Sequence, residues 1–155
     1  KGEVEYAHVR IPAPDASSYA VHKSMQGNKR KDTKPELLVR QRLREAGLGG
    51  YRLQWKVPGH PDVAWPGKKV ALFIHGCYWH RCPHCNLSLP KKNTEYWVAK
   101  FNRNQERDAQ NEAALIADGW KVHVVWECEL KKGKREETFA KLLPVLAHEL
   151  GKELR

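Results

Sequence analysis

The stretch DVAWPGKKVALFIH, residues 62–75, predicts the centre of the fold. A short apolar run, DVAW (62–65), is followed by the turn signal WPGKK and then by KVALFIH (69–75), an apolar run with β-branched residues. Such runs are typical of central strands, and Pro-Gly marks a tight turn. We therefore predict a β-hairpin that brings Asp62 close to residues 73–75.

The segments around this hairpin alternate between helical and strand patterns. A helix is expected over 35–47, because Thr33 and Glu36 match a capping box at its start. Further elements are expected as strands at 51–57 and 120–127, a polar helix at 94–118, and a last helix at 139–150 that Pro144 splits or kinks. This order predicts an α/β fold with a mixed central sheet flanked by helices.

The chain has 155 residues, which suits one domain with a modest core. Residues 1–30 have weak periodicity and end in the basic run NKRKD (28–32). We expect an N-terminal arm over 1–30 and a folded domain over 31–155.

The balance of charge favours a polyanionic partner. Lys and Arg number 28 against 18 acidic residues, a formal net charge of +10. Phosphate contacts release condensed counterions, so such a chain suits nucleic acid, although a basic protein without such a partner is the alternative. No apolar run approaches the roughly 18 residues of a membrane helix, and no membrane partner is expected.

The next stretch along the chain, HGCYWHRCPHC (75–85), predicts a metal site. Cys82 and Cys85 form a C-x₂-C pair, Cys77 precedes them, and Cys128 follows a predicted strand. Thiolates bind Zn²⁺ tetrahedrally, so the four cysteines predict a structural zinc site, with His84 as an alternative ligand. Cysteines grouped in this way are typical of an intracellular metal site rather than of a secreted disulfide scaffold. Unligated or redox-active thiols are the other interpretation.

A second, hydrolytic site is predicted around the hairpin. Asp62, a strand-end backbone carbonyl and nearby histidines could hold Mg²⁺, which prefers oxygen ligands. Because four cysteines already fill a zinc tetrahedron, His75 and His80 are left for acid–base work or water positioning. The alternatives are a turn role for Asp62, a surface role for each histidine, and a capping role alone for Glu36.

From about Ser24 to Leu130 the sequence resembles the very short patch repair (Vsr) endonucleases, bacterial DNA mismatch endonucleases with a restriction-endonuclease-like core. The motifs that carry the resemblance are, in order, DTKPE (32–36), GHPDV (59–63), FIHGCYWH (73–80), NTEYW (93–97), KFNRNQERD (100–108) and GWKVHVVWEC (119–128). The resemblance implies that residues 31–155 form a restriction-endonuclease-like core with a structural zinc site.

The family nicks DNA beside a thymine mispaired with guanine. By resemblance, Asp62 and the backbone carbonyl of Ile74 would bind magnesium directly. His75 and Glu36 would act through metal-bound waters, and His80 would be the general base. Two-metal catalysis would stabilise the attacking and leaving oxygens.

The resemblance also implies a DNA-binding surface. Tyr78 and Trp79 match rings that wedge into the base stack beside the mismatch, and Trp97 matches a third; ordinary core packing is the alternative, above all for Trp97. The arm could add DNA contacts of its own. Candidate phosphate contacts, or alternatively a solvated face, are Lys91, Lys92, Lys100, Arg103 and Arg107.

The loop after His80 departs from the family pattern. The family has a ligand where Cys82 stands and another two residues later, at His84, so either His84 or Cys85 completes the zinc site. Alternative functions are a DNA endonuclease of this fold without mismatch preference and a non-catalytic, zinc-stapled DNA-binding module. We expect a monomer in the bacterial cytoplasm, associated with the nucleoid.

Overall fold

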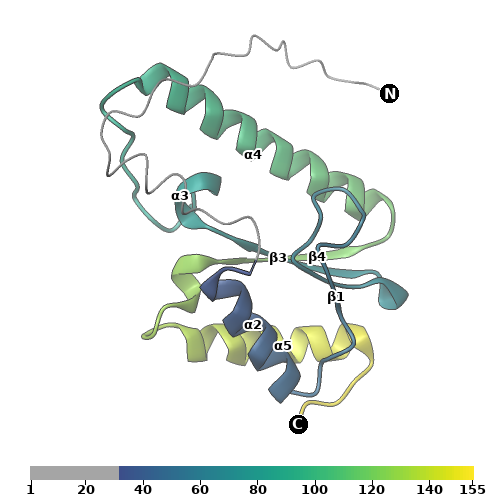
Figure 1. Ribbon diagram of the computed structural model, residues 1–155. Coiled ribbons are helices and arrows are strands. Elements are labelled where there is room, and N and C mark those ends of the chain that lie inside the picture. The colour runs from purple at the N-terminus through teal and green to yellow at the C-terminus, as the bar shows by residue number, and fades with distance from the viewer. Residues whose placement is uncertain (1–31) are drawn as a thin grey trace.

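A mixed four-stranded sheet with helices on both faces makes up the part of the chain that the computed structural model describes, residues 32–155 (Figure 1). The arm expected over 1–30 lies outside these residues. The sheet has the order β1-β2-β3-β4, with β1 at Arg52–Leu53, β2 at Val63–Trp65, β3 at Val70–His75 and β4 at Lys121–Trp126. The helices are α2 (Lys34–Glu45), η1 (Pro66–Lys68), α3 (Cys77–His80), α4 (Thr94–Ala117), η2 (Glu127–Leu130) and α5 (Arg135–Leu150).

The expected hairpin is present. β2 and β3 pair antiparallel with Val63 opposite Leu72, and the turn between them is η1 followed by Lys69 at a left-handed φ of 53°. β3 and β4 pair in parallel, because α4 carries the chain back across one face of the sheet. The sheet is therefore mixed, as the sequence predicted.

Alternate residues of β3 enter two different cores. Val70 and Leu72 face α2 and α5, whereas Ala71 and Phe73 face α4. Because both faces of this strand are covered, its sequence is apolar throughout. The helical residues of the first core include Val39, Leu43, Phe139, Leu146 and Leu150, and those of the second include Leu115.

The strand expected at 51–57 is wrong beyond Leu53. Gln54 has a left-handed φ of 47°, which a strand cannot continue through, and turns follow at Val57 and His60. The alternating pattern has another cause, because Trp55 and Val57 pack against the α4-side core from a loop.

Two further details concern the helices. The C-terminal helix is not split, since α5 runs through Pro144 and buries Phe139 and Leu146 on either side of it. The cysteine-rich stretch after β3, for which no helix was predicted, contains the short helix α3. Among the described residues, no helix has the length and apolarity needed to cross a membrane.

Leu72 lies at the centre of the fold and is fully buried. Leu72→Ala should lower the free energy of unfolding by about 3 kcal/mol, because it removes buried apolar contacts and leaves a cavity. Urea unfolding followed by circular dichroism measures the change. Ile116→Ala, at a position that is 56% exposed on α4, is the control and should cost less than about 1 kcal/mol. Equal losses in the two variants would contradict this description of the core.

Candidate active site and cysteine cluster

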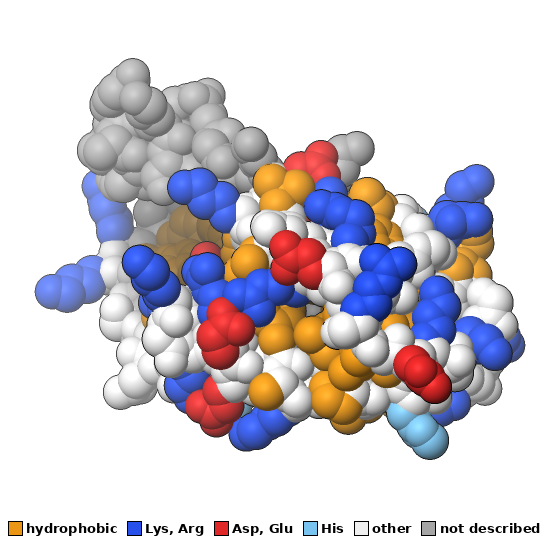
Figure 2. All heavy atoms as spheres, turned by 90° about the horizontal axis from the view of Figure 1, so that it is seen from below, with side chains coloured by type: hydrophobic (Ala, Val, Ile, Leu, Met, Phe, Trp, Pro, Cys, Tyr) orange, Lys and Arg blue, Asp and Glu red, His pale blue; other side chains and the backbone are white. Residues whose placement is uncertain are grey.

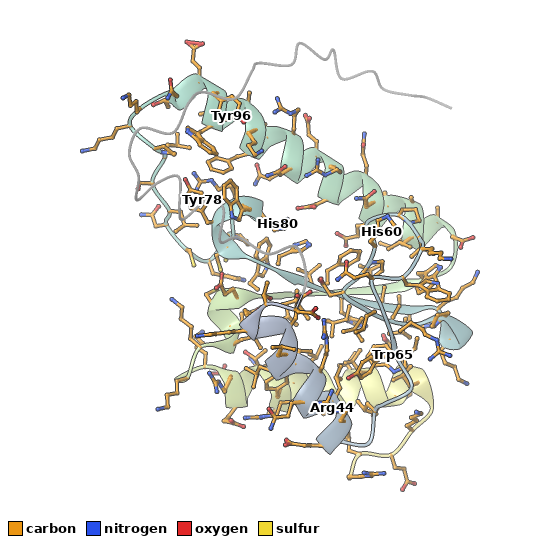
Figure 3. All side chains as sticks on the ribbon, in the orientation of Figure 1. Arg44, His60, Trp65, Tyr78, His80 and Tyr96 are labelled. Atoms are coloured by element: carbon orange, nitrogen blue, oxygen red, sulfur yellow. The ribbon has the colours of Figure 1, made fainter. Side chains whose placement is uncertain are left out.

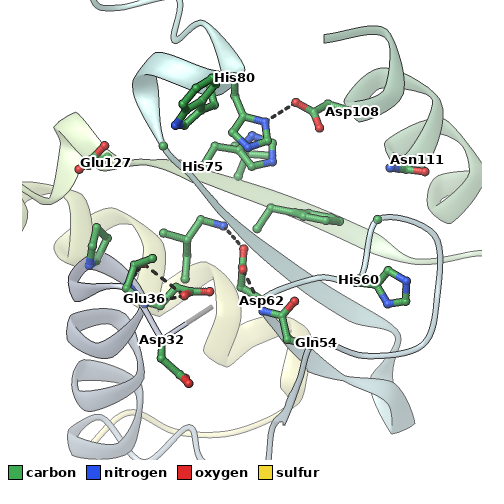
Figure 4. Close-up of a pocket in the computed structure, with 18 of the residues that line it drawn as sticks. Asp32, Glu36, Gln54, His60, Asp62, His75, His80, Asp108, Asn111 and Glu127 are labelled. Carbon is green, nitrogen blue, oxygen red and sulfur yellow. Dashed lines mark hydrogen bonds and ion pairs between the residues drawn. The ribbon is translucent and has the colours of Figure 1, made fainter. Parts of the chain in front are cut away.

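A cavity of about 870 Å³ lies where the N-terminal end of α2, the end of β3, α3 and α4 meet (Figure 4). Asp62 stands at its wall, one residue before β2. Its Oδ2 accepts a hydrogen bond of 2.7 Å from the Ile74 backbone N–H, and its Oδ1 accepts one of 3.2 Å from Gln54 Nε2. The hairpin thus brings Asp62 to the end of β3, as its spacing predicted.

Glu36 reaches the same cavity from the first turn of α2. It completes the capping box, because its Oε1 accepts from the Thr33 backbone N–H at 2.9 Å. Its Oε2 is buried and has no hydrogen-bond partner among the described residues. One carboxylate oxygen therefore caps the helix while the other remains available to a ligand, so capping does not exclude a second role.

The two carboxyl groups of Asp62 and Glu36 face each other (Figure 4). Burial, and then the adjoining carboxyl group of Glu36, raise the pKa of Asp62 to about 7. Two largely buried carboxylates that repel each other form a set of hard oxygen ligands, and a divalent cation such as Mg²⁺ would relieve the repulsion. The donor chemistry therefore fits a hard metal ion.

Two histidines line the other side of the cavity. The rings of His75 and His80 stack with centroids 4.0 Å apart and an angle of 4° between the planes. His80 Nδ1 lies 2.5 Å from Asp108 Oδ2 on α4. Burial, and then the neighbouring His80, lowers the pKa of His75 to about 4, so its imidazole is neutral at pH 7. The atoms of His75, His80 and Asp108 form a compact polar group.

The four cysteines come together on the other side of α3. The sulfur atoms of Cys77, Cys82, Cys85 and Cys128 all lie within 4.8 Å of one another, and those of Cys82 and Cys128 are 3.6 Å apart. His84 is exposed and donates its backbone N–H to Cys82 Sγ at 3.3 Å. Burial raises the pKa of the Cys77 thiol to about 11, so a metal ion that binds here must displace protons.

The aromatic residues predicted to meet DNA form one cluster between α3 and α4. The rings of Tyr78 and Trp79 each lie within 6.2 Å of the Phe101 ring, and Trp97 lies 5.9 Å from both Trp79 and Phe101. Phe101 is buried, whereas Tyr78 remains 37% exposed. Figure 3 shows Tyr78, His80 and Tyr96 on the α4 side of the sheet, opposite Trp65 and Arg44.

The basic residues singled out from the sequence lie on or beside α4. Lys91, Lys92 and Arg107 are exposed, and Lys100 and Arg103 are partly exposed. Lys and Arg side chains are also scattered over the opposite, lower face among apolar and acidic ones (Figure 2). The charge of the chain alone therefore does not locate a DNA-binding surface.

Sequence reasoning missed Asp108 and Gln54, which contact predicted site residues in the cavity. Asp108 ends the motif KFNRNQERD, but its contact with His80 spans 28 positions and has no local signal. Gln54 falls in a segment that was predicted as strand. The available sign for Asp108 was its place in one of the motifs that carry the family resemblance, whereas the left-handed backbone of Gln54 had no sign in the sequence.

Opposed carboxyl groups, a His–Asp pair and clustered thiols beside a group of aromatic rings fit one class of proteins, the metal-dependent DNA nucleases. Comparison with known proteins agrees. The family model of the DNA mismatch endonuclease Vsr matches residues 18–87. The DNA mismatch endonuclease Vsr of Escherichia coli (strain K12) is 37% identical over 111 residues, which are 70% of this chain and 70% of that protein.

Nicking enzymes are similar as well. The type II nicking enzyme V.XorIIP of Xanthomonas oryzae pv. oryzae is 45% identical over 108 residues, 68% of this chain and 78% of that enzyme. V.NmeAIP of Neisseria meningitidis is 45% identical over 102 residues, 65% of this chain and 72% of that enzyme. The chain belongs to the Vsr family of DNA endonucleases.

The raised pKa of Asp62 gives a testable dependence of stability on pH. The folded protein holds the proton of Asp62 up to about pH 7, whereas an unperturbed aspartate releases it near 3.8. The contribution of Asp62 to stability is therefore fully present below about pH 4 and is lost as the pH rises to about 7. Asp62→Asn cannot ionise and should be more stable than the wild type at pH 8 by about 1–4 kcal/mol without added Mg²⁺.

Urea unfolding at pH 5 and pH 8 measures this difference, and no chelator is added, so that any ion held by the cysteines stays in place. Adding Mg²⁺ at pH 8 should stabilise the wild type and leave Asp62→Asn unchanged. The same pH dependence in both proteins would show that Asp62 is not the strained group.

Proposed function

We propose that this Vsr-family endonuclease nicks one strand of double-stranded DNA next to a T:G mismatch, by Mg²⁺-dependent hydrolysis of a phosphodiester bond. One observation carries the proposal: a single cavity holds the opposed carboxylates of Asp62 and Glu36 on one side and the His80–Asp108 pair on the other. A phosphodiester placed between them would meet a cation site and a base together.

Asp62 and the free Oε2 of Glu36 would hold the metal ion, and the family resemblance adds the Ile74 backbone carbonyl. When bound, Mg²⁺ supplies positive charge to the phosphate oxygens as negative charge develops on them. The hydrogen bond from the Ile74 N–H keeps Asp62 aimed at the cavity. The lowered pKa of His75 keeps that ring uncharged beside the cation site, where it can order water.

His80 is the proposed general base. With Asp108 accepting from Nδ1–H, the imidazole would present Nε2 as its acceptor. Nε2 would then take the proton from the attacking water as the water oxygen bonds to phosphorus. The bond from phosphorus to the leaving sugar oxygen breaks, and that oxygen takes a proton from solvent. Asp108 does not touch the substrate in this scheme; it fixes the tautomer and orientation of His80 and stabilises its charged form.

The aromatic cluster is proposed as the wedge that opens the mismatch. Tyr78 and Trp79 stand in α3 directly before His80, so a base step held by these rings lies next to the cavity. Stacking on an aromatic ring contributes about 1–3 kcal/mol per base, and a mispaired step costs less to open than a paired one. The lysines and arginines of α4 would bind the flanking phosphates.

The four cysteines are proposed to bind one structural Zn²⁺. Thiolates 2.3 Å from zinc in a tetrahedron lie roughly 3.8 Å apart, close to the 3.6 Å between Cys82 and Cys128. The ion would hold both ends of α3 and thereby the wedge and His80. We further propose a restriction-endonuclease-like core, a monomer with one cutting site, and action on the nucleoid in the bacterial cytoplasm.

The zinc site gives a prediction about its fourth ligand. Cys85→Ser should lose the bound zinc, whereas His84→Ala should retain it, because Cys85 lies in the sulfur cluster and His84 is exposed. Metal analysis of the purified proteins measures zinc per chain, and the spectrum of the cobalt-substituted wild type reports four thiolates. Zinc lost from His84→Ala and kept by Cys85→Ser would reverse the assignment.

The catalytic proposal is tested by nicking of labelled duplexes in Mg²⁺. The wild type should cut a T:G duplex at one strand and leave its T:A twin largely intact. His80→Ala should slow nicking by about 10²–10⁴-fold while DNA binding is retained. Asp62→Asn should abolish nicking, and Asp108→Asn should have a smaller effect than His80→Ala.

Each contrary result points to a different account. Equal cutting of the T:A and T:G duplexes would show a Vsr-fold endonuclease without mismatch preference. A wild type that binds DNA but never cuts would indicate a non-catalytic DNA-binding module.

A further inference from the structure

We propose that Gln54 is a positioning residue that fixes the plane of the Asp62 carboxylate and so sets the affinity of the site for Mg²⁺. The inference rests on the proposed function, in which Asp62 holds the metal ion. It starts from the hydrogen bond that Gln54 Nε2 donates to Asp62 Oδ1 at 3.2 Å (Figure 4).

Gln54 faces Asp62 because the β1–β2 ladder continues past its last strand pair. Leu53 pairs with Val63, and the Trp55 N–H donates to the Pro61 carbonyl at 3.3 Å. Gln54 and Asp62 are therefore opposite each other at the loop end of this hairpin. Residues directly opposite in an antiparallel pair have neighbouring side chains, so the contact is built into the register.

With this contact, both oxygens of the Asp62 carboxylate accept a hydrogen bond. The Ile74 backbone N–H binds Oδ2 and the Gln54 amide binds Oδ1, so both oxygens are tied. Rotation about the bond to an Asp carboxylate is soft, and one hydrogen bond alone leaves it able to turn. Two donors from different segments fix the plane and leave a lone pair on each oxygen free for a cation.

The backbone of Gln54 supports a role beyond closing a loop. Its φ of 47° is uncommon for a residue with a side chain, and it ends β1 at this point. Such strain persists where the surroundings over-determine it, often at functional sites. Here the left-handed turn ends the strand at the residue whose amide meets Asp62.

Gln54→Met tests the inference, because it keeps the length of the side chain and removes the amide donor. Gln41→Met is the matched control, since Gln41 lies exposed on α2 and its amide bonds only to Glu45 in the described residues. Nicking of the T:G duplex is titrated with Mg²⁺ for the wild type and both variants. Without DNA, the rise in Tm with added Mg²⁺ gives a second readout that needs no activity.

We expect Gln54→Met to raise the Mg²⁺ concentration for half-maximal nicking about tenfold, the usual effect of losing one hydrogen bond to a charged group. The Mg²⁺ dependence of Tm should shift by a similar factor, nicking should largely recover at saturating Mg²⁺, and Gln41→Met should match the wild type. An unchanged Mg²⁺ midpoint in both readouts would overturn the inference.

A loss of nicking that is equal at every Mg²⁺ concentration would also overturn it, because it would indicate a structural or direct catalytic role. Failure of the proposed function is distinguishable. In that case the wild type does not nick DNA, while the Mg²⁺-dependent Tm of the two variants still decides the role of Gln54.

Discussion

The site depends on the forced proximity of two carboxyl groups, Asp62 and Glu36, in a largely buried position. Burial disfavours the charged form of Asp62, the neighbouring acid Glu36 adds to the effect, and together they raise the pKa of Asp62. The two acids stay close because each is held by a segment whose structure does not depend on their contact. Asp62 is held by the β2–β3 hairpin, and Glu36 by the capping box that starts α2.

The remainder of the site is tied to these acids through α3. A helix of four residues has no stability of its own in water, so other contacts must hold it. The cysteine cluster flanks α3, the aromatic rings of Tyr78 and Trp79 pack on α4, and His80 meets Asp108 of α4. The cysteine cluster thus flanks the same short helix that ends at His80, which explains why cysteines and histidines are interleaved in this stretch of the sequence.

The features predictable from sequence were those with local signals. The hairpin followed from an apolar run and a Pro-Gly turn, the start of α2 from its capping box, and the cysteine cluster from ligand spacing. What failed depended on distant contacts. Trp55 and Val57 alternate with polar residues as in a strand, yet they pack from a loop because Gln54 turns the backbone. The pairing of His80 with Asp108 required knowing that α4 crosses above α3.

The central claim is that a hard cation binds between Asp62 and Glu36, separately from any ion held by the cysteines. Anomalous diffraction from crystals soaked in Mn²⁺ tests this claim directly, because Mn²⁺ can replace Mg²⁺ and scatters X-rays anomalously. The account predicts a manganese peak within bonding distance of a carboxylate oxygen of both residues. Manganese absent from this position, with the only anomalous peak at the four sulfur atoms, would contradict it.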